Sequence, residues 1–454
     1  MARGLAAIAA GLVLSLAVAG CTTDQPTPPQ GSPPSSQPPA GPRKLTFGAF
    51  GQPEELTAFK QVVDSFNASS QTRQVELITW TDREQALDDV LHGRAPDAFL
   101  TSQGDLGALA DTASTRPVSL LLDERGIDFG DRYSRDALEA FSYDDDLQCM
   151  PYSVSPMVIY YNDELVDFAK MQRRELDVPL DAEGEISDRW DLDQFAEAAT
   201  FASRRGDVDG VWIEPTLLGL SPFIYSGDGQ VFDGDEPTSL AFSSDGTRAA
   251  LEQTLAILRD PLLTPSGEEL RKATALQLFK RGKLAMIAGF RRLVPELREV
   301  ESLSFDTISM PVIDSAATVG EIEGLCIKAN TPYVNDAADF LAFAVSDAAL
   351  EIVARTGYIV PANTEVASSD AFLSSPQDPA HASVFNSAIR GMVVPPRLDD
   401  SASLEEAVAP LVEDLVTSPG ILDLELMTEE IDLASRTVLS PESVPETPSE
   451  SPSS

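Results

Sequence analysis

The hydrophobic pattern is strongest between residues 149 and 162. Within it, residues 157–161 carry no charge and are rich in β-branched and aromatic side chains, which predicts a strand buried on both faces. Pro151 and Pro156 each lack a backbone donor and hold the preceding residue in an extended conformation. After Asn162 the apolar positions return at helical spacing. The stretch therefore predicts an extended crossing from one packed body into another.

Strand and helix patterns alternate before this crossing. Residues 44–50, 75–80 and 95–100 have the composition of strands, and residues 54–66 carry an apolar stripe at helical spacing. Residues 81–84 form a capping-box pattern that predicts the start of a second helix. The alternation predicts a mainly parallel sheet, in which ligands bind beyond the carboxyl ends of the strands. The residues at these ends are Gly51, Gln52, Trp80, Thr101, Gln103 and Asp105.

Similar signals continue after the crossing. Asp191, with Gln194 three residues later, predicts a helix start, which makes Trp190 a structural residue rather than a ligand platform. Residues 211–213 predict a short strand with Glu214 at its end. Ser244 predicts another helix start.

One long helix is expected near the end of the folded region. Residues 335–355 predict a helix capped by Asn335, and Gly357 stands near its end as a stop.

The N-terminus has the pattern of an export signal. Arg3 precedes an apolar run over residues 5–19, which is too short to span a membrane as a mature helix. Small residues lead directly to Cys21, which resembles a bacterial lipobox. On this interpretation Cys21 carries diacylglycerol and palmitate and anchors the protein at the outer face of the cell membrane. The alternative is an ordinary secretory signal with an incidental cysteine.

Two tails flank a region large enough for two lobes. Residues 22–43 contain eight prolines and predict a flexible tether, and residues 440–454 have a similar composition. The roughly 395 residues between them exceed what one core usually holds. The net charge of −41 argues against nucleic acid and anionic lipid as partners. It leaves two interpretations open, a cationic ligand or simply a well-solvated surface, of which the second is the simpler.

The residue types needed for several chemistries are scarce. The chain has two histidines and three cysteines, none at metal-ligand spacing, and neither a nucleophile elbow nor a phosphate-binding loop. Residues 144–146 and 228–236 are acidic but lack the alternating oxygen pattern of a calcium loop. The sequence therefore predicts no metal and no cofactor.

The ordered set of motifs resembles the family 1 extracellular solute-binding proteins, the sugar-type receptors of ABC importers. The resemblance is carried by the Pro-Asp strand at Pro96–Asp97, the crossing that ends in Tyr161-Asn162, residues 275–287 followed by Gly289, and residues 357–362. It covers residues 44–435 and implies an α/β, two-lobed, periplasmic-binding-protein-like (type II) fold with hinge crossovers. It also implies a monomeric binding protein rather than an enzyme.

The resemblance implies a ligand site in which aromatic residues are fewer than is usual. Residues 290–292 read Phe-Arg-Arg and Thr101 replaces an aromatic, so that only Trp80 of the three tryptophans is expected to face the cleft. The two arginines suit an anionic or heavily hydroxylated ligand, or else form surface salt bridges. The candidate ligand-binding residues are Gln52, Trp80, Thr101, Gln103, Asp105, Ser155, Glu214, Arg291 and Arg397.

The same resemblance implies a disulfide. With Cys21 acylated, Cys149 and Cys326 remain as an even pair in an oxidising compartment. In this family the strands that carry them are antiparallel neighbours, which brings the two sulfurs nearly opposite each other. The alternative is two free buried thiols.

The expected organisation follows in chain order. Residues 1–20 are the signal peptide, 21–43 the lipidated cysteine and disordered tether, 44–153 the first part of lobe I, 154–320 the first part of lobe II, 321–372 the second part of lobe I, 373–437 the C-terminal helices mainly of lobe II, and 438–454 a disordered tail.

The expected function is that of a membrane-anchored receptor. It closes over a small solute, expected to be a carbohydrate, and presents it to an ABC importer permease. A cell-surface enzyme acting on glycans, and a sensor or interaction lipoprotein that does not transport, remain alternatives. The enzyme would need paired carboxylates in a cleft, and no motif selects a pair.

Overall fold

The computed structural model describes residues 43–181, 184–187, 189–373, 378–396, 398 and 401–443. The chain divides into two units, Met1–Gly41 and Pro42–Ser454. The first unit, with Cys21 and the predicted signal peptide, lies outside the described residues, as do Arg397 and residues 444–454 of the tail.

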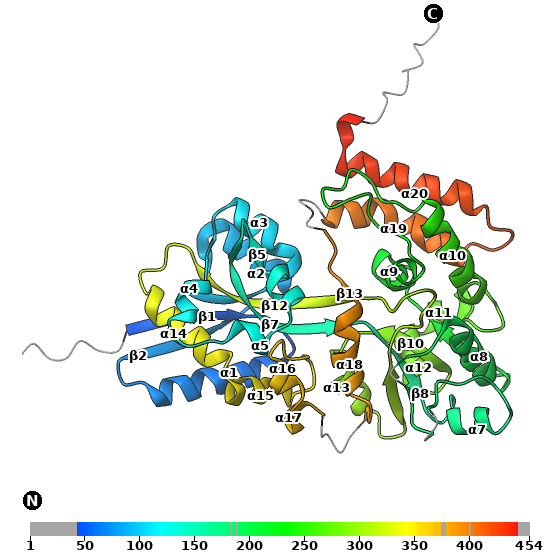
Figure 1. The fold of residues 1–454 in the computed structure, drawn as a ribbon, viewed down its shortest axis with the longest axis horizontal. Helices are drawn as coiled ribbons and strands as arrows, with labels where there is room; N and C mark the ends of the chain where they lie inside the picture. Colours follow the sequence, from blue (N-terminus) through cyan, green and yellow to red (C-terminus); the bar gives the residue numbers. More distant parts are fainter. Residues whose placement is uncertain are drawn as a thin grey trace, which may run out of the picture. The chain divides into compact units, whose positions relative to one another are not determined.

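The unit Pro42–Ser454 contains two lobes, each built on its own sheet (Figure 1). The sheet of lobe I has the strand order β13–β12–β3–β1–β2, and β4 and β7 also pair with β12. Its strands are β1 (Arg43–Ala49), β2 (Arg73–Thr79), β3 (Ala98–Ser102), β4 (Thr115–Arg116), β7 (Cys149–Pro156), β12 (Thr318–Lys328) and β13 (Met392–Val393). β1 runs parallel to β2 and β3, whereas β12 runs antiparallel to β3, β4 and β7. The sheet is therefore mixed, and the prediction of a mainly parallel sheet holds for its β3–β1–β2 side.

Short and long helices surround the lobe I sheet. They are α1 (Pro53–Ser69), α2 (Arg83–Asp89) with η1 (Val90–Arg94), η2 (Gln103–Asp105), α3 (Leu106–Asp111), α4 (Ser119–Asp123), α5 (Phe129–Arg132), α6 (Arg135–Ala140), α14 (Val334–Ala344), α15 (Asp347–Ala354), α16 (Thr364–Ala367) and α17 (Asp370–Leu373). A small hairpin, β5 (Ser142–Tyr143) and β6 (Asp146–Leu147), precedes β7.

The sheet of lobe II has the strand order β11–β8–β10–β9. Its strands are β8 (Val158–Asn162), β9 (Asp209–Trp212), β10 (Leu284–Gly289) and β11 (Phe305–Ile308). Its helices are α7 (Phe168–Gln172), α8 (Leu192–Ser203), α9 (Leu217–Ser226), α10 (Asp245–Leu258), α11 (Gly267–Lys272), α12 (Ala275–Lys280), α13 (Leu293–Arg298), α18 (Ser383–Ala388) with η3 (Ile389–Gly391), α19 (Ser401–Thr417) and α20 (Leu424–Leu439) with η4 (Pro441–Ser443).

Strand β8 confirms the prediction made from the uncharged run. All five of its residues are buried. Val158 and Tyr160 pack into the core on one face of the lobe II sheet, and Ile159 and Tyr161 pack into the core on the other. The absence of charge along this strand follows from its two buried faces, because either face would have to desolvate a charged side chain.

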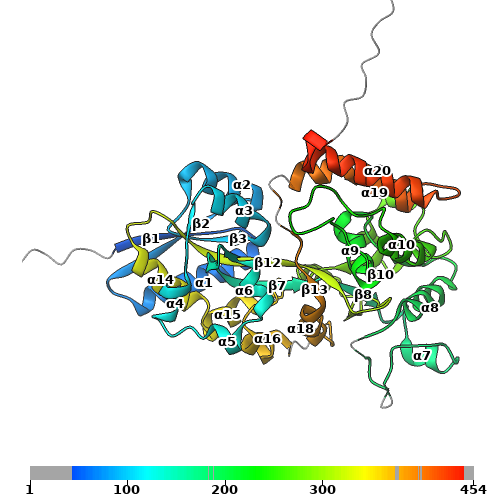
Figure 2. The ribbon, with the colours of Figure 1, turned by 45° about the horizontal axis from the view of Figure 1, so that its top comes forward.

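Strands β7 and β12 form the crossing between the lobes (Figures 1 and 2). They are antiparallel, in a register that runs from Gly320 opposite Pro156 to Cys326 opposite Cys149, with an irregularity between Glu323 and Gly324. All eight residues of β7 are buried, which agrees with the absence of charged residues from this stretch.

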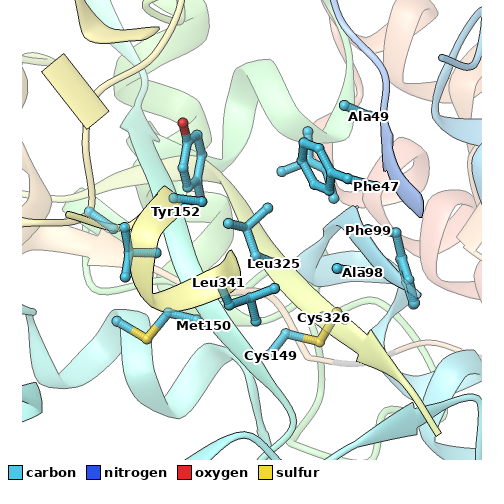
Figure 3. Close-up of a cluster of buried hydrophobic side chains, with 14 of the residues drawn as sticks. Phe47, Ala49, Ala98, Phe99, Cys149, Met150, Tyr152, Leu325, Cys326 and Leu341 are labelled. Carbon is cyan, nitrogen blue, oxygen red and sulfur yellow. A yellow bond between two sulfur atoms is a disulfide. The ribbon is translucent and has the colours of Figure 1, made fainter. Parts of the chain in front are cut away.

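A disulfide joins Cys149 to Cys326, as the sequence predicts. The two Cα atoms are 4.3 Å apart, a separation typical of directly opposed residues on antiparallel strands. Both cysteines are fully buried in the lobe I core, beside Leu325 (Figure 3). The crosslink therefore fastens the two crossing strands at their lobe I end.

Two local predictions need correction. The second helix is capped by Asp82 rather than Thr81, because the Asp82 carboxylate accepts a hydrogen bond from the Gln85 amide at 2.8 Å. The long helix expected over residues 335–355 is two helices, α14 and α15, and Tyr333 rather than Asn335 precedes the first. Ser346, with extended backbone at φ −66° and ψ 151°, separates them.

Other helix starts agree with the sequence. Asp191 and Gln194 form a capping box at α8, and Ser244 caps α10. Trp190 is 2% exposed and its Nε1–H donates to the Ser309 carbonyl at 2.8 Å, which confirms its structural role.

Candidate ligand-binding cleft

A cavity of about 330 Å³ lies at the carboxyl ends of β9 and β10 in lobe II. Its wall combines apolar surface with one carboxylate and one guanidinium. Its lining residues include Met157, Trp212, Glu214, Leu276, Phe290 and Arg292. A volume of this size lies at the lower end of the range of small-molecule sites, which combine apolar surface with a few polar groups.

Two strand ends bring Trp212 and Glu214 to this cavity. Trp212 is the last residue of β9 and lies opposite Ile287 of the parallel strand β10. The chain then turns into α9, whose start is capped by the Thr216 hydroxyl accepting from the Gly219 amide at 3.0 Å. Gly219 is required here, because an added Cβ would lie 2.1 Å from the Glu214 carbonyl oxygen. Glu214 is left exposed at the rim.

Lobe I contributes charged side chains near the crossing strands, which we call the floor of the cleft. Glu55 is in the first turn of α1, and its carboxylate accepts from the Gln52 amide at 3.0 Å. Glu323 is on β12 opposite Ser102, the last residue of β3, and accepts from the Ser153 hydroxyl at 2.9 Å. Burial is the main cause that raises the pKa of Glu55 to about 7, and repulsion from Glu323 adds to it. Burial likewise raises the pKa of Glu323.

Two arginines lie beside these carboxylates and are already paired. Arg83 binds both carboxylate oxygens of Asp105, with its Nη2 at 2.7 Å from Oδ1. Arg292 of lobe II forms an ion pair with Glu321 of β12 and interacts electrostatically with Glu55 and Glu323. Burial lowers the pKa of Arg292. The lobe II cavity and the lobe I floor therefore share one electrostatic network.

A second cavity, of about 900 Å³, is lined from both lobes. Lobe I contributes Gln103, Asp111, Asp136 and Glu139, and lobe II contributes Asp235, Glu236 and the last residues of α20. Met392 of β13, residues 394–396 and Leu398 also border it. Five carboxylates line this cavity, and none of its described lining residues is a lysine or arginine.

Trp80, which was expected to face the cleft, is a core residue of lobe I. Trp80 is 4% exposed and belongs to the lobe I core. Its ring packs so closely on β1 that a Cβ added at Gly48 would lie 2.3 Å from it. The Nε1–H donates to Asp89 at 2.8 Å. Trp212 is instead the tryptophan that lines a cavity of the cleft.

Arg291 was expected either to bind the ligand or to form a surface salt bridge, and its burial agrees with neither. Its side chain is 1% exposed and lies between the rings of Phe372 and Phe385, with Cζ at 4.5 Å and 5.0 Å from their centroids. Its amide donates to Ser155 Oγ at 2.9 Å, and its Nε donates to the Gly357 carbonyl at 3.1 Å. Burial lowers the pKa of this guanidinium to about 10. Arg291 therefore fastens the end of β10 to the crossing strands, whereas Arg292 makes the predicted salt bridge.

The remaining candidates separate by burial. Ser155, Thr101 and Asp105 are 6%, 5% and 4% exposed. Ser155 is engaged by Arg291 and Asp105 by Arg83. The more accessible candidates are Gln52, Gln103 and Glu214, and Gln103 and Glu214 line the two cavities.

Sequence analysis missed Glu55, Glu323 and Trp212. Glu55 and Trp212 could have been found, because both stand at carboxyl ends of strands or just beyond them. Glu323 gave no such signal, since it lies in the middle of β12 and reaches the edge of the sheet only through the register with β3.

In the part of the chain that the structure describes, no group of three or more His, Cys, Asp or Glu residues could hold a metal ion. None of the helices described is long and apolar enough to cross a membrane.

The sequence model of bacterial extracellular solute-binding proteins matches residues 61–382. The chain belongs to this family. Family membership places the protein outside the cytoplasm and makes it a substrate-binding protein rather than an enzyme, as predicted. Among curated protein sequences, none matches this chain.

Solved structures of solute-binding proteins share the fold. The ABC substrate-binding protein Lmo0181 of Listeria monocytogenes, in complex with cycloalternan, has a TM-score of 0.70 at 19% identity, covering 87% of this chain and 98% of that one. The cyclic α-maltosyl-1,6-maltose binding protein of Arthrobacter globiformis has a TM-score of 0.69 at 16% identity, covering 88% and 99%. The GacH receptor of Streptomyces glaucescens has a TM-score of 0.68 at 14% identity, covering 87% and 98%. This solute-binding protein therefore has the two-lobed fold that the resemblance implied.

Proposed function

We propose that this solute-binding protein binds a carbohydrate between its lobes and delivers it to an ABC importer. The observation that carries the proposal is Trp212 at the wall of the lobe II cavity, with Glu214 and Arg292 on the same wall. An indole offers a broad apolar face to the C–H face of a sugar ring, while charged groups bind hydroxyls. The similar structures named above include proteins described as binding cycloalternan and cyclic α-maltosyl-1,6-maltose.

Lobe closure supplies the signal that an importer would read. The cavity residues belong to lobe II and the carboxylates of the floor to lobe I, so a ligand that touches both sets favours the closed arrangement by its differential affinity. A non-transporting sensor is the rival function. A permease gene adjacent to this one supports import, and a sensor kinase gene in its place supports sensing.

The direct test is a thermal-shift screen across neutral sugars, amino sugars, amino acids, polyamines and organic acids. A ligand at 100 times its dissociation constant stabilises a folded protein by about 2.7 kcal/mol. We expect stabilisation by mono- or oligosaccharides. Stabilisation by amino acids or organic acids alone would contradict the carbohydrate assignment.

Trp212→Ala is expected to weaken binding of the best saccharide by about 2 kcal/mol, roughly 30-fold, the size of a buried aromatic hot spot. Trp212 is 7% exposed and also packs in the core, so Trp212→Phe, which keeps an aromatic ring, is the matched variant and should bind with intermediate affinity. Isothermal titration calorimetry measures both. Unchanged affinity in a folded Trp212→Ala protein would rule out the indole as a binding surface.

We further propose that Cys21 is lipidated and that residues 22–43 tether the receptor to the cell membrane. The small residues before Cys21 and the proline-rich composition after it support this arrangement. Cys21→Ser is expected to move the protein from the membrane fraction to the culture medium with an unchanged melting temperature, because the tether adds nothing to the core. Retention in the membrane fraction would contradict the anchor.

The lobe boundaries and oligomeric state belong to the same proposal. We assign residues 44–153 and 321–372 to lobe I, and residues 154–320 with most of 373–437 to lobe II, in a monomeric receptor. The core contacts support this division, since Phe47, Phe99 and Leu325 share one cluster and Phe195, Phe223 and Val412 share another.

A further inference from the structure

The floor of the cleft carries more negative charge than its arginines compensate. Among the described residues, Glu55, Glu321, Glu323 and Asp105 lie within one electrostatic network with two arginines, Arg83 and Arg292. Both arginines already form ion pairs, Arg83 with Asp105 and Arg292 with Glu321.

The two remaining carboxylates are hydrogen-bonded to neutral groups. Glu323 accepts from the Ser153 hydroxyl and Glu55 from the Gln52 amide. A buried carboxylate is stable as an anion only when a positive charge or several hydrogen bonds compensate its lost hydration.

An unpartnered hydroxyl lies in the same network. Tyr152 is 1% exposed, and its Oη has no hydrogen-bond partner among the residues described. Its ring packs on Phe59, one helical turn after Glu55, with the centroids 5.6 Å apart. Its hydroxyl points away from the disulfide (Figure 3). Burial raises the pKa of Tyr152, and the negative charges of Glu323 and Glu55 add to this effect. A buried hydroxyl without a partner costs stability unless a ligand completes it.

The larger cavity, lined from both lobes, has the same charge bias. The larger cavity is lined by five carboxylates, from Asp111, Asp136 and Glu139 of lobe I and Asp235 and Glu236 of lobe II. Fields of one sign in a cleft raise the local concentration of ligands of the opposite sign.

We propose that Glu55, Glu323 and the Tyr152 hydroxyl form a subsite for an ammonium group, so that the ligand is an aminated carbohydrate. An ammonium offers donors to both carboxylates and to the free lone pair of Tyr152, and its charge offsets the excess of carboxylates. Trp212 and Glu214, in the cavity that Arg292 joins to this floor, bind the sugar rings. The inference rests on the proposed carbohydrate function and narrows the class of sugar.

The test compares ligands that differ only in the amine. Calorimetric titrations use D-glucosamine, N-acetyl-D-glucosamine and D-glucose, and the β-1,4-linked dimers and trimers of each, at a pH at which the amine is protonated. We expect the aminated member of the best-binding set to bind at least about tenfold more tightly than its neutral counterparts, the effect of one charge-assisted contact.

Variants test which residues cause the preference for the aminated sugar. Glu323→Gln and Tyr152→Phe are expected to reduce the preference to threefold or less (roughly the loss of one hydrogen bond or charge contact), while affinity for the neutral sugars changes little. Glu54→Gln is the matched control, because Glu54 is in the same helical turn as Glu55 but is exposed and bonded to Tyr358. Tyr152→Phe should also leave the urea midpoint of the ligand-free protein unchanged or higher, since it removes an unsatisfied buried hydroxyl.

Each outcome decides one statement. Equal or tighter binding of the neutral sugars overturns the ammonium subsite and leaves the carbohydrate function standing. A preference for the amine that survives Glu323→Gln and Tyr152→Phe overturns the assignment to these residues. If no saccharide of either kind binds, the carbohydrate function itself fails, and this inference fails with it.

Discussion

Loss of the Cys149–Cys326 disulfide is expected to lower the free energy of unfolding by on the order of 5 kcal/mol. The bond joins residues 177 positions apart, so its reduction restores the conformational freedom of a very long loop in the unfolded chain. Both sulfurs are fully buried and directly opposed in the native strands, so the crosslink needs no displacement of the backbone. The figure follows the chain-entropy model and is the largest single effect expected in this protein.

Urea unfolding of the oxidised protein, with and without a reductant, measures this effect. The double variant Cys149→Ala/Cys326→Ala is the control, and its stability should not respond to the reductant. Ligand affinity should stay within about threefold (under 1 kcal/mol), because the crosslink lies at the lobe I end of the crossing strands and leaves their lobe II end free. Two alkylatable thiols in the non-reduced mature protein would contradict the bond.

Trp80→Ala is expected to lower the free energy of unfolding by about 3–5 kcal/mol, the usual cost of removing a large aromatic side chain from a core. Trp80 is 4% exposed, packs against Gly48, and donates a hydrogen bond to Asp89. Its removal therefore leaves a cavity beside β1, while Asp89 keeps its bond from Arg94.

Urea unfolding of the ligand-free protein measures the loss, and Trp80→Phe, which keeps part of the volume, should recover part of it. The folded fraction of Trp80→Ala should still bind the best saccharide with a dissociation constant close to that of the unmodified protein. A stable Trp80→Ala protein that no longer binds would return Trp80 to the ligand site. Together with Trp212→Ala, this variant separates the structural tryptophan from the binding one.

Local chemistry was enough to predict several elements from the sequence. The run at residues 157–161 has no charged side chain that would need contact with solvent, which predicts a strand buried on both faces. Strand β8 is such a strand. Asp191 and Gln194 cap α8 through contacts within four residues, which makes their geometry independent of the rest of the fold. The disulfide was also predictable, once the resemblance to solute-binding proteins supplied the pairing of the two crossing strands.

Tertiary structure alone decided which side chains meet at the cleft. Trp80 and Trp212 both end or follow a strand and both pack in a core, but Trp80 packs against Gly48 in lobe I, whereas Trp212 also lines a cavity. Arg291 and Arg292 are neighbours in sequence, yet one is buried between two phenylalanine rings and the other reaches Glu321.

Long-range register set the floor of the cleft in the same way. Glu323 joins Ser153 and the end of β3 across 170 and 221 positions of the chain. The sequence by itself determined the strands, caps and cysteine pair, because these depend on local pattern and on the topology of a known family. The binding groups depend on which residues from distant segments of the chain are brought together. The local sequence pattern around each residue does not show which distant residues become its neighbours in the fold.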